Sequence, residues 1–234
     1  MKDFQTYISN GIHSIGCTGQ SVYVFDKTGN EIAKFKDLIY AYYAMISPNG
    51  KFFVVKSSEG CIAVYSLETL SLIKKFRFSM APSDEGFCFS QDGTEFYNIE
   101  SHRNADTPKT AVAVYDTSDF SLKKRILDDN TRLYLSMLEM CDDEIYILGS
   151  KKPSEDREDI EDSKYFVGKL TNDELDSITI SDREYWYYYE YLDFKLKGFA
   201  KKESRSLSSL FKFYVSKSEE SLNVFEYREP DVDL

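Results

Sequence analysis

Residues 41–78, AYYAMISPNGKFFVVKSSEGCIAVYSLETLSLIKKFRF, decide the fold class of this chain. They contain four runs of apolar and β-branched residues, separated by short polar segments such as Asn49-Gly50 and Glu59-Gly60. Asn-Gly between apolar runs is the strongest short-range hairpin signal, because both central residues tolerate positive φ. The stretch therefore predicts a meander of four antiparallel strands.

The same pattern recurs along the chain. Residues 86–101 and 111–127 repeat it, with Gly93 in the place of Gly50. A strand ending in valine and followed by a polar turn occurs five times, at Val24, Val64, Val114, Val167 and Val215. The spacing of roughly 40 to 50 residues is that of a four-stranded propeller blade. One blade cannot bury both of its faces, so we expect the blades to stack around a common axis.

Two turns and two dipeptides carry a resemblance to a known repeat family. Ser47-Pro48-Asn49-Gly50-Lys51 resembles the Ser-Pro-Asp-Gly-Lys turn of WD repeats, and Ser90-Gln91-Asp92-Gly93 is a weaker copy. Phe25-Asp26 and Tyr115-Asp116 correspond to the family's Trp-Asp dipeptide, whereas its Gly-His dipeptide occurs nowhere in the chain. The chain is thus similar to WD-repeat β-propellers, best over residues 21–126, and the resemblance implies fold rather than function.

The predicted fold is all-β and β-propeller-like, with about five four-stranded blades in a single domain. We expect the blades at residues 1–37, 38–78, 79–127, 128–182 and 183–227, followed by an acidic tail at 228–234. No N-terminal strand is left over to complete the last blade, so an open or irregular ring is the alternative to a closed one. Lysines recur in each fourth strand, among them Lys74 and Lys124, and we interpret them as protection of an exposed sheet edge.

Charge and hydropathy exclude several classes of function. The chain has 29 Lys and Arg against 40 Asp and Glu, a net charge of −11, which argues against nucleic acid or anionic membrane as partner. No apolar run reaches the roughly 20 residues of a membrane helix, and the N-terminus lacks the apolar core of a signal peptide. We therefore expect a cytoplasmic protein, and the sequence leaves its oligomeric state open.

The residues that usually carry catalysis or bind metals are scarce. The chain holds two histidines, His13 and His102, and four cysteines, Cys17, Cys61, Cys88 and Cys141, with no Cys-x-x-Cys pair. We predict no metal site, no cofactor and no catalytic residue, and we expect free thiols, with Cys61 and Cys88 buried in apolar strands. Carboxylates are plentiful, however. A carbohydrate-binding or glycoside-hydrolysing five-bladed propeller, which needs two facing carboxylates for hydrolysis, is therefore the alternative function.

Two segments are candidate binding sites for a partner protein. The first is the acidic run of residues 154–162, with Glu155, Asp156, Glu158, Asp159, Glu161 and Asp162, which either is a solvated loop or docks a basic protein. The second is the aromatic run of residues 184–191. If it forms a strand, most of its rings pack between blades, and a ring near its start, Tyr185 or Trp186, stays exposed.

Strand order indicates where such loops gather. The insertions at 101–110, 150–163 and 202–209 are all expected to connect second to third strands, which places them at one end of the ring. The sequence thus predicts a non-catalytic protein–protein interaction module. An acidic immunity or inhibitor protein that binds a basic partner is one setting that suits this composition.

Overall fold

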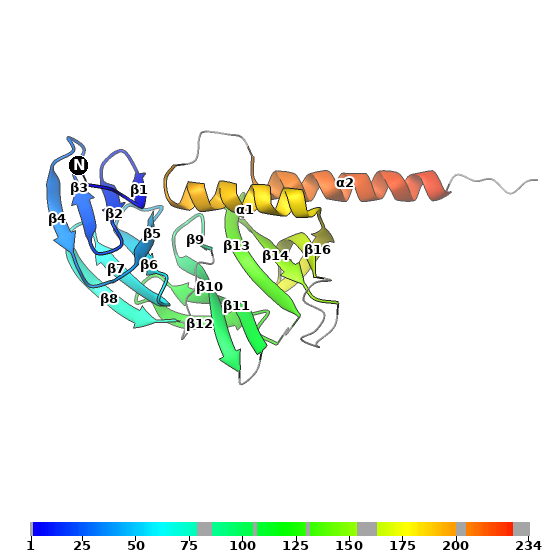
Figure 1. Cartoon of the computed structure of the whole chain (residues 1–234), viewed down its shortest axis with the longest axis horizontal. Coiled ribbons are helices and arrows are strands. Elements are labelled where there is room, and N and C mark those ends of the chain that lie inside the picture. The colour runs from blue at the N-terminus through cyan, green and yellow to red at the C-terminus, as the bar shows by residue number, and fades with distance from the viewer. Residues whose placement is uncertain are drawn as a thin grey trace, which may run out of the picture.

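The computed structural model describes residues 2–78, 86–104, 107–129, 132–153, 163–199 and 205–226. For residues 102–104, 107–109 and 219–226 it describes the backbone alone. Over these residues the chain forms sixteen strands in four antiparallel sheets, followed by two helices (Figure 1).

Each sheet is a meander of four consecutive strands. The first contains β1 (Thr6–Ser9), β2 (Ser14–Cys17), β3 (Val22–Phe25) and β4 (Glu31–Phe35). The second contains β5 (Ala41–Ile46), β6 (Phe52–Ser57), β7 (Cys61–Ser66) and β8 (Ser71–Arg77). The third contains β9 (Phe87–Phe89), β10 (Glu95–Asn104), β11 (Thr107–Asp116) and β12 (Ser121–Ile126). The fourth contains β13 (Leu133–Cys141), β14 (Glu144–Lys151), β15 (Lys164–Thr171) and β16 (Glu174–Thr179).

The all-β, propeller-like fold is confirmed, and the sheets form an open arc. The fifth blade expected over residues 183–227 is wrong, because this segment forms helices α1 (Asp182–Leu196) and α2 (Leu207–Glu226). Helix α1 begins at a capping box. Ser181 Oγ accepts a hydrogen bond from the Glu184 N–H, and the Glu184 carboxylate accepts one from the Ser181 N–H, each at 3.3 Å. A Ser-x-x-Glu pattern before an apolar run is a helix-start signal, and here it prevails over the strand preference of the tyrosines.

The helix pair covers the face of the fourth sheet that a fifth blade would otherwise cover. Neighbouring sheets bury apolar clusters between them, and the last cluster joins sheet residues such as Tyr146 and Val167 to Leu192 of α1 and Phe211 of α2. The rings of Tyr146 and Phe211 lie 5.9 Å apart. Two amphipathic helices therefore satisfy the same need to bury a sheet face as another blade would.

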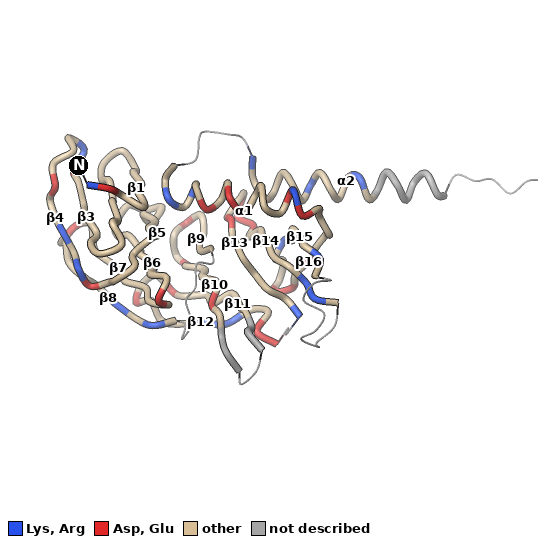
Figure 2. The backbone as a smooth tube through the Cα atoms, viewed as in Figure 1, with Lys and Arg blue, Asp and Glu red and all other residues tan. Residues whose placement is uncertain are grey.

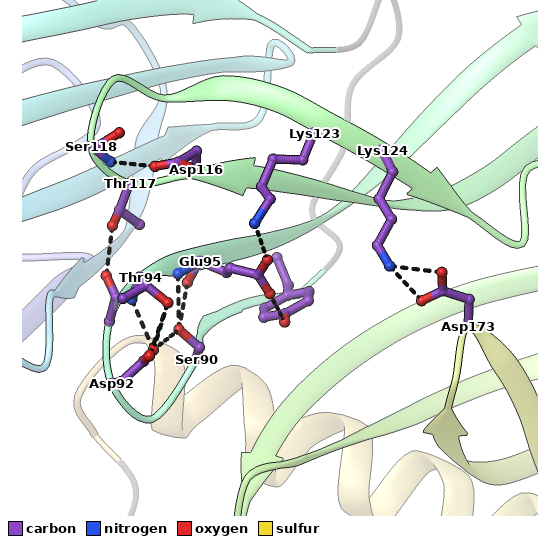
Figure 3. A network of polar contacts seen from close by, with 12 residues as sticks. Ser90, Asp92, Thr94, Glu95, Asp116, Thr117, Ser118, Lys123, Lys124 and Asp173 are labelled. Carbon is purple, nitrogen blue, oxygen red and sulfur yellow. Dashed lines mark hydrogen bonds and ion pairs between the residues drawn. The ribbon is translucent and has the colours of Figure 1, made fainter.

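The turns that resemble WD repeats are built alike in the second and third sheets. Ser47 Oγ donates to Asn49 Oδ1 at 2.8 Å and accepts from the Phe52 N–H at 3.2 Å. In the third sheet Ser90 Oγ donates to Asp92 Oδ1 at 2.7 Å, and Asp92 in turn accepts from the Thr94 N–H at 3.0 Å (Figure 3). These side chains satisfy the backbone of a tight turn, which gives the motif a structural role.

Two lysines of the outer strands join neighbouring blades. Lys74 in β8 donates to the carbonyl of Phe120 at 2.8 Å, in the β11–β12 turn of the next sheet. At the equivalent place in β12, Lys124 donates to Asp173 at 2.7 Å, in the β15–β16 turn (Figure 3). The interpretation of these lysines as edge protection alone is therefore too narrow, since each also bonds to the following blade.

Two of the three expected insertions lie where a second strand is followed by a third. Residues 101–104 and 107–110 are the paired ends of β10 and β11, so this insertion lengthens a hairpin and is not a loop, whereas the chain between Lys151 and Lys164 connects β14 to β15. Residues 202–209 instead lie between the two helices and at the start of α2, so they are no part of a blade. Neither described helix combines the length and the apolar character needed to cross a membrane.

Candidate functional site

The structure describes two of the eight residues expected at a partner site. Glu155, Asp156, Glu158, Asp159, Glu161 and Asp162 lie outside the described residues, so their role stays a prediction. Tyr185 and Trp186 lie in the first turns of α1 rather than in a strand. Adjacent residues of a helix point in directions about 100° apart, and the two side chains have different surroundings.

Tyr185 is part of the core. It is 5% exposed, and its ring stacks on that of Tyr165 in β15 with the centroids 3.9 Å apart and the planes at 17°. The Tyr185 hydroxyl shares a hydrogen bond of 2.8 Å with Ser136 Oγ in β13. Burial raises the pKa of the Tyr185 hydroxyl above its usual range. Tyr185 therefore fixes α1 to the fourth sheet and is not available to a partner.

Trp186 lies at the edge of the solvent side of α1, where its ring packs edge-on against Tyr185 at 5.1 Å and Tyr189 at 5.7 Å between centroids. Its side chain is 51% exposed, and Tyr187 and Phe194 on the same side are 40% and 52% exposed. Arg183 and Glu190 complete this side, because positions 183, 186, 187, 190 and 194 fall within one face of a helix. These residues share one face only if the segment is a helix with 3.6 residues per turn. The sequence prediction missed the group because it assigned this segment a period of two.

The second helix and the segment before it extend this surface. Phe213 of α2 is 48% exposed, and the Arg205 guanidinium lies over the Tyr187 ring at 4.9 Å from its centroid. Lys217 Nζ lies over the Phe213 ring at 4.4 Å. Such cation–π contacts hold cations against aromatic faces at the surface. We call the whole surface the helix-pair face; it comprises Arg183, Glu184, Trp186, Tyr187, Glu190, Phe194, Phe199, Arg205, Phe213 and Lys217.

A hollow of about 660 Å³ runs between the helices within this face. Tyr187 and Tyr188 line it from α1, and Phe213 and Tyr214 line it from α2. Glu184 lies beside it. Burial raises the pKa of the Glu184 carboxyl, but hydrogen bonds from Tyr214 and Ser181 outweigh burial and leave that pKa below its usual value. The hollow thus combines aromatic walls with a fixed carboxylate at one side.

The helix-pair face differs in charge from the chain as a whole. It carries three cations, Arg183, Arg205 and Lys217, and two carboxylates, Glu184 and Glu190, whereas the chain has a net charge of −11; Figure 2 shows acidic and basic residues interspersed along the helices. The face is therefore aromatic and has an excess of one positive charge on an otherwise acidic protein.

The far end of α1 is fixed to the first two sheets. The Tyr43 hydroxyl in β5 donates to Asp193 Oδ1 at 2.9 Å, and the Tyr7 N–H in β1 donates to the Lys197 carbonyl at 2.9 Å. Gly198 follows with φ of +78°, and a Cβ there would lie 1.9 Å from the Tyr7 carbonyl oxygen. Any other residue would push α1 away from β1. Helix α1 therefore spans the opening of the arc and is held at both ends.

Glu139 in β13 connects both helices to the blades. The residue is 5% exposed, and its carboxylate accepts from Lys195 Nζ of α1 and, at 2.6 Å, from the backbone N–H of Leu207 at the start of α2. An anion at a helix N-terminus is stabilised by unpaired N–H groups there. Over the described residues, no group of three or more His, Cys, Asp and Glu side chains is placed to hold a metal ion.

Comparison with known proteins adds evidence on the fold. No family model matches the sequence, and no curated protein matches it. Similar solved structures include hydrazine synthase from Kuenenia stuttgartiensis, at 16% identity and TM-score 0.58. They also include the WD40 domain of Toxoplasma gondii coronin, at 12% and 0.51, and U3-55K, at 11% and 0.52. The likeness is one of fold.

The matches cover 74–76% of this chain but 44–52% of the other chains. The chain thus spans about half the length of the structures it resembles. The WD-repeat resemblance in the turns agrees with WD40 domains among the structural neighbours, whereas no sequence family is shown.

Proposed function

We propose that this chain is a non-catalytic protein-interaction module that binds a partner protein through the helix-pair face. One observation carries the proposal: every exposed Phe and Trp among the described residues, namely Trp186, Phe194, Phe199 and Phe213, lies on the helices or in the turn after α1. Clustered exposed aromatic side chains mark interaction sites, and Trp, Tyr and Arg are the residues most often dominant in binding.

The rigidity of the face supports the same proposal. Tyr185 and Leu192 pack α1 onto the fourth sheet, and Tyr43 and Tyr7 hold its other end. A surface that is already ordered loses little conformational entropy when a partner binds, so more of the contact energy appears as affinity.

The chemistry of the face indicates the kind of partner. Its aromatic hollow suits an apolar anchor, and Arg183 and Arg205, which line it, suit acidic residues beside that anchor. We therefore propose an acidic, apolar segment of a protein as the ligand of this face. A basic partner of the acidic run at 154–162 is a separate proposal that rests on sequence alone.

A glycoside hydrolase receives less support. Such an enzyme needs two carboxylates across a cleft, roughly 5 to 9.5 Å apart. The cavity between the innermost strands has one carboxylate, Glu139, among its lining residues, and that group already bonds to Lys195 and Leu207. The four cysteines are all free in the structure, which supports a reducing compartment such as the cytoplasm.

The test compares three forms of the protein in affinity capture from native lysate and in selection from a random-peptide display library. The helix-face variant carries Trp186→Ala, Phe194→Ser and Phe213→Ser; the control carries Ile32→Ser, Ile73→Ser and Leu122→Ser on outer strands of the blades. A partner or peptide retained by the wild type and the control but lost by the helix-face variant supports the proposal. Selected peptides should be enriched in aromatic and acidic residues. Undiminished capture by the folded helix-face variant would overturn it.

A further inference from the structure

A second concave site lies where the innermost strands of all four sheets meet. A cavity of about 590 Å³ is lined by residues of β1, β5, β9 and β13 and by one side of α1. In Figure 1, β1, β5, β9 and β13 follow one another from left to right, with β1 beside the left end of α1 and β9 and β13 below the helix. The helix-pair face is on the solvent side of the helices, whereas this cavity is on their inner side, so the two sites are distinct.

The cavity is graded from an apolar floor to a polar mouth. Ala44, Phe87, Leu138 and Leu192 are at most 3% exposed and belong to its floor. The lining then follows each innermost strand toward its first turn, where it becomes polar: Ser9, Asn10, Ser47, Ser90 and Gln91. All four innermost strands run in the same direction in a meander propeller, so these turns share one end, which forms the mouth.

The walls between floor and mouth are flexible and apolar. Met45 from β5 and Met140 from β13 are both half-buried and both line the cavity. Methionine side chains adapt their shape to an irregular or variable ligand.

The charges in the cavity cancel. Lys195 and Glu139 are its two charged lining residues, and they form an ion pair with each other. Since each of these charges already has its counter-charge, a charged ligand finds no opposite charge in the lining unless it breaks the pair. A net charge of −11 on the chain adds a further cost for an anion.

We propose that this central cavity binds a neutral, largely apolar small molecule whose polar group lies at the mouth, near Asn10 and Gln91. Its volume falls within the roughly 300–1,000 Å³ range of ligand sites, which are mostly apolar with a few polar groups that fix orientation. Water in a cavity with an apolar floor has few hydrogen-bonding partners, so an apolar ligand displaces it at a gain.

The methionines provide a direct test on the unmodified protein. With the methionine methyl groups labelled with carbon-13, 2-naphthol serves as a neutral aromatic probe in an NMR titration. The Met45 and Met140 signals should shift together with one dissociation constant. Met137, which is fully buried outside the cavity, should not shift and serves as the internal control. Unmoved Met45 and Met140 signals, or separate dissociation constants for the two, would overturn the proposal.

Filling the cavity from either wall gives a second test. Met45→Trp and Met140→Trp, measured separately, should each weaken probe binding by about tenfold or more, because the ring occupies the space of the ligand. Ile73→Trp on the exposed outer strand β8 is the matched control and should bind the probe normally. Phe213→Ser on the helix-pair face should also bind normally, so failure of one site is distinguishable from failure of the other. Unchanged binding in both folded filling variants contradicts the cavity as the site.

Discussion

The buried carboxylate of Glu139 in β13 accepts a hydrogen bond from the backbone N–H of Leu207, the first residue of α2, at 2.6 Å. The same carboxylate is paired with Lys195 of α1, so one side chain of the fourth sheet holds both helices. The bond to Leu207 satisfies an N–H that has no partner within the helix. Attachment of the helix pair thus depends on an anion among apolar residues.

Replacing Glu139 should therefore loosen both helices. Glu139→Gln removes the charge that faces Lys195 and the helix start, and we expect the free energy of unfolding to fall by about 1–3 kcal/mol. Denaturant unfolding followed by circular dichroism measures it. Glu144→Gln is the matched control, since Glu144 pairs with Lys169 at the surface and its loss should change stability much less. Equal effects of the two substitutions would show that Glu139 does not hold the helices.

The turn of the first sheet should weaken in acid. Hydrogen bonds from the Thr28 side chain and the Asn30 backbone lower the pKa of Asp26 to about 2. A lowered pKa in the folded state means that the ionised carboxylate stabilises the turn above its unfolded pKa of about 4. That contribution is lost as the pH falls from about 4 through 2. A carbon-13 titration of the carboxyl groups measures the pKa.

Thr28→Val supplies the matched test of this cause. It should raise the pKa of Asp26 toward its ordinary value and leave the pKa of Asp92, which is lowered within its own turn by the Thr94 backbone and Ser90, unchanged. An Asp26 pKa that is the same in wild type and Thr28→Val would contradict the assignment.

Much of the blade architecture can be predicted from the sequence, because signals between residues close together in the chain determine it. The Asn49-Gly50 turn and the Ser90-to-Gly93 copy occur where the structure has tight turns between first and second strands. Val24, Val64, Val114 and Val167 lie in the third strand of each sheet, so the repeat period located four blades correctly. Each signal acts within one hairpin and does not depend on distant residues.

The helices were missed because two patterns compete after residue 181. Alternating rings from Tyr185 onward fit a strand, and Val215 fits the end of a fifth repeat. The Ser181–Glu184 capping box favours a helix instead. Contacts far apart in sequence complete the outcome, for instance Tyr185 with Ser136 and Asp193 with Tyr43. Side-chain spacing alone does not reveal such long-range packing.

The thiols should differ in reactivity according to their depth. Cys17 and Cys88 are buried, and burial raises the pKa of Cys17 to about 12. Cys61, expected to be buried, is half-buried in the structure, as is Cys141. With Ellman's reagent at neutral pH, Cys61 and Cys141 should react first, and Cys17 and Cys88 only after denaturant is added. Fast reaction of Cys17 in the folded protein, or fewer than four thiols after denaturation without oxidant, would contradict this order.

The acidic run at 154–162 is testable through its charge. Replacing Asp156, Glu158 and Asp159 by Ser should slow association with a basic partner and reduce its salt dependence, because exposed charges are screened beyond about 10 Å at 0.1 M salt. Thermal stability should stay within about 0.5 kcal/mol of wild type. A control with Glu68, Asp129 and Glu174 changed to Ser removes the same charge from positions that are exposed in the structure. Equal association rates for the two variants would mean that the run is solvated only.

Tyr185 and Trp186 should give opposite results although they are neighbours in the chain. Tyr185→Ala removes a ring that is 5% exposed and stacked on Tyr165, so we expect a loss of about 3–4 kcal/mol in the free energy of unfolding. Trp186→Ala removes a side chain that is 51% exposed and should cost less than about 1 kcal/mol.

For partner binding, the order of the two residues should be reversed: the substitution of Trp186 should have the larger effect and that of Tyr185 the smaller one. Trp186→Ala should weaken binding of a captured partner or selected peptide by about tenfold or more, because Trp is among the residue types most enriched in hot spots and half of this side chain is exposed on the face. Tyr185→Phe, which keeps the ring and removes only the hydroxyl bonded to Ser136, should bind the partner as the wild type does. Calorimetric titration measures both. Normal binding by Trp186→Ala together with impaired binding by folded Tyr185→Phe would show that the partner contacts the inner side of α1. That result would refute the solvent side as the binding surface.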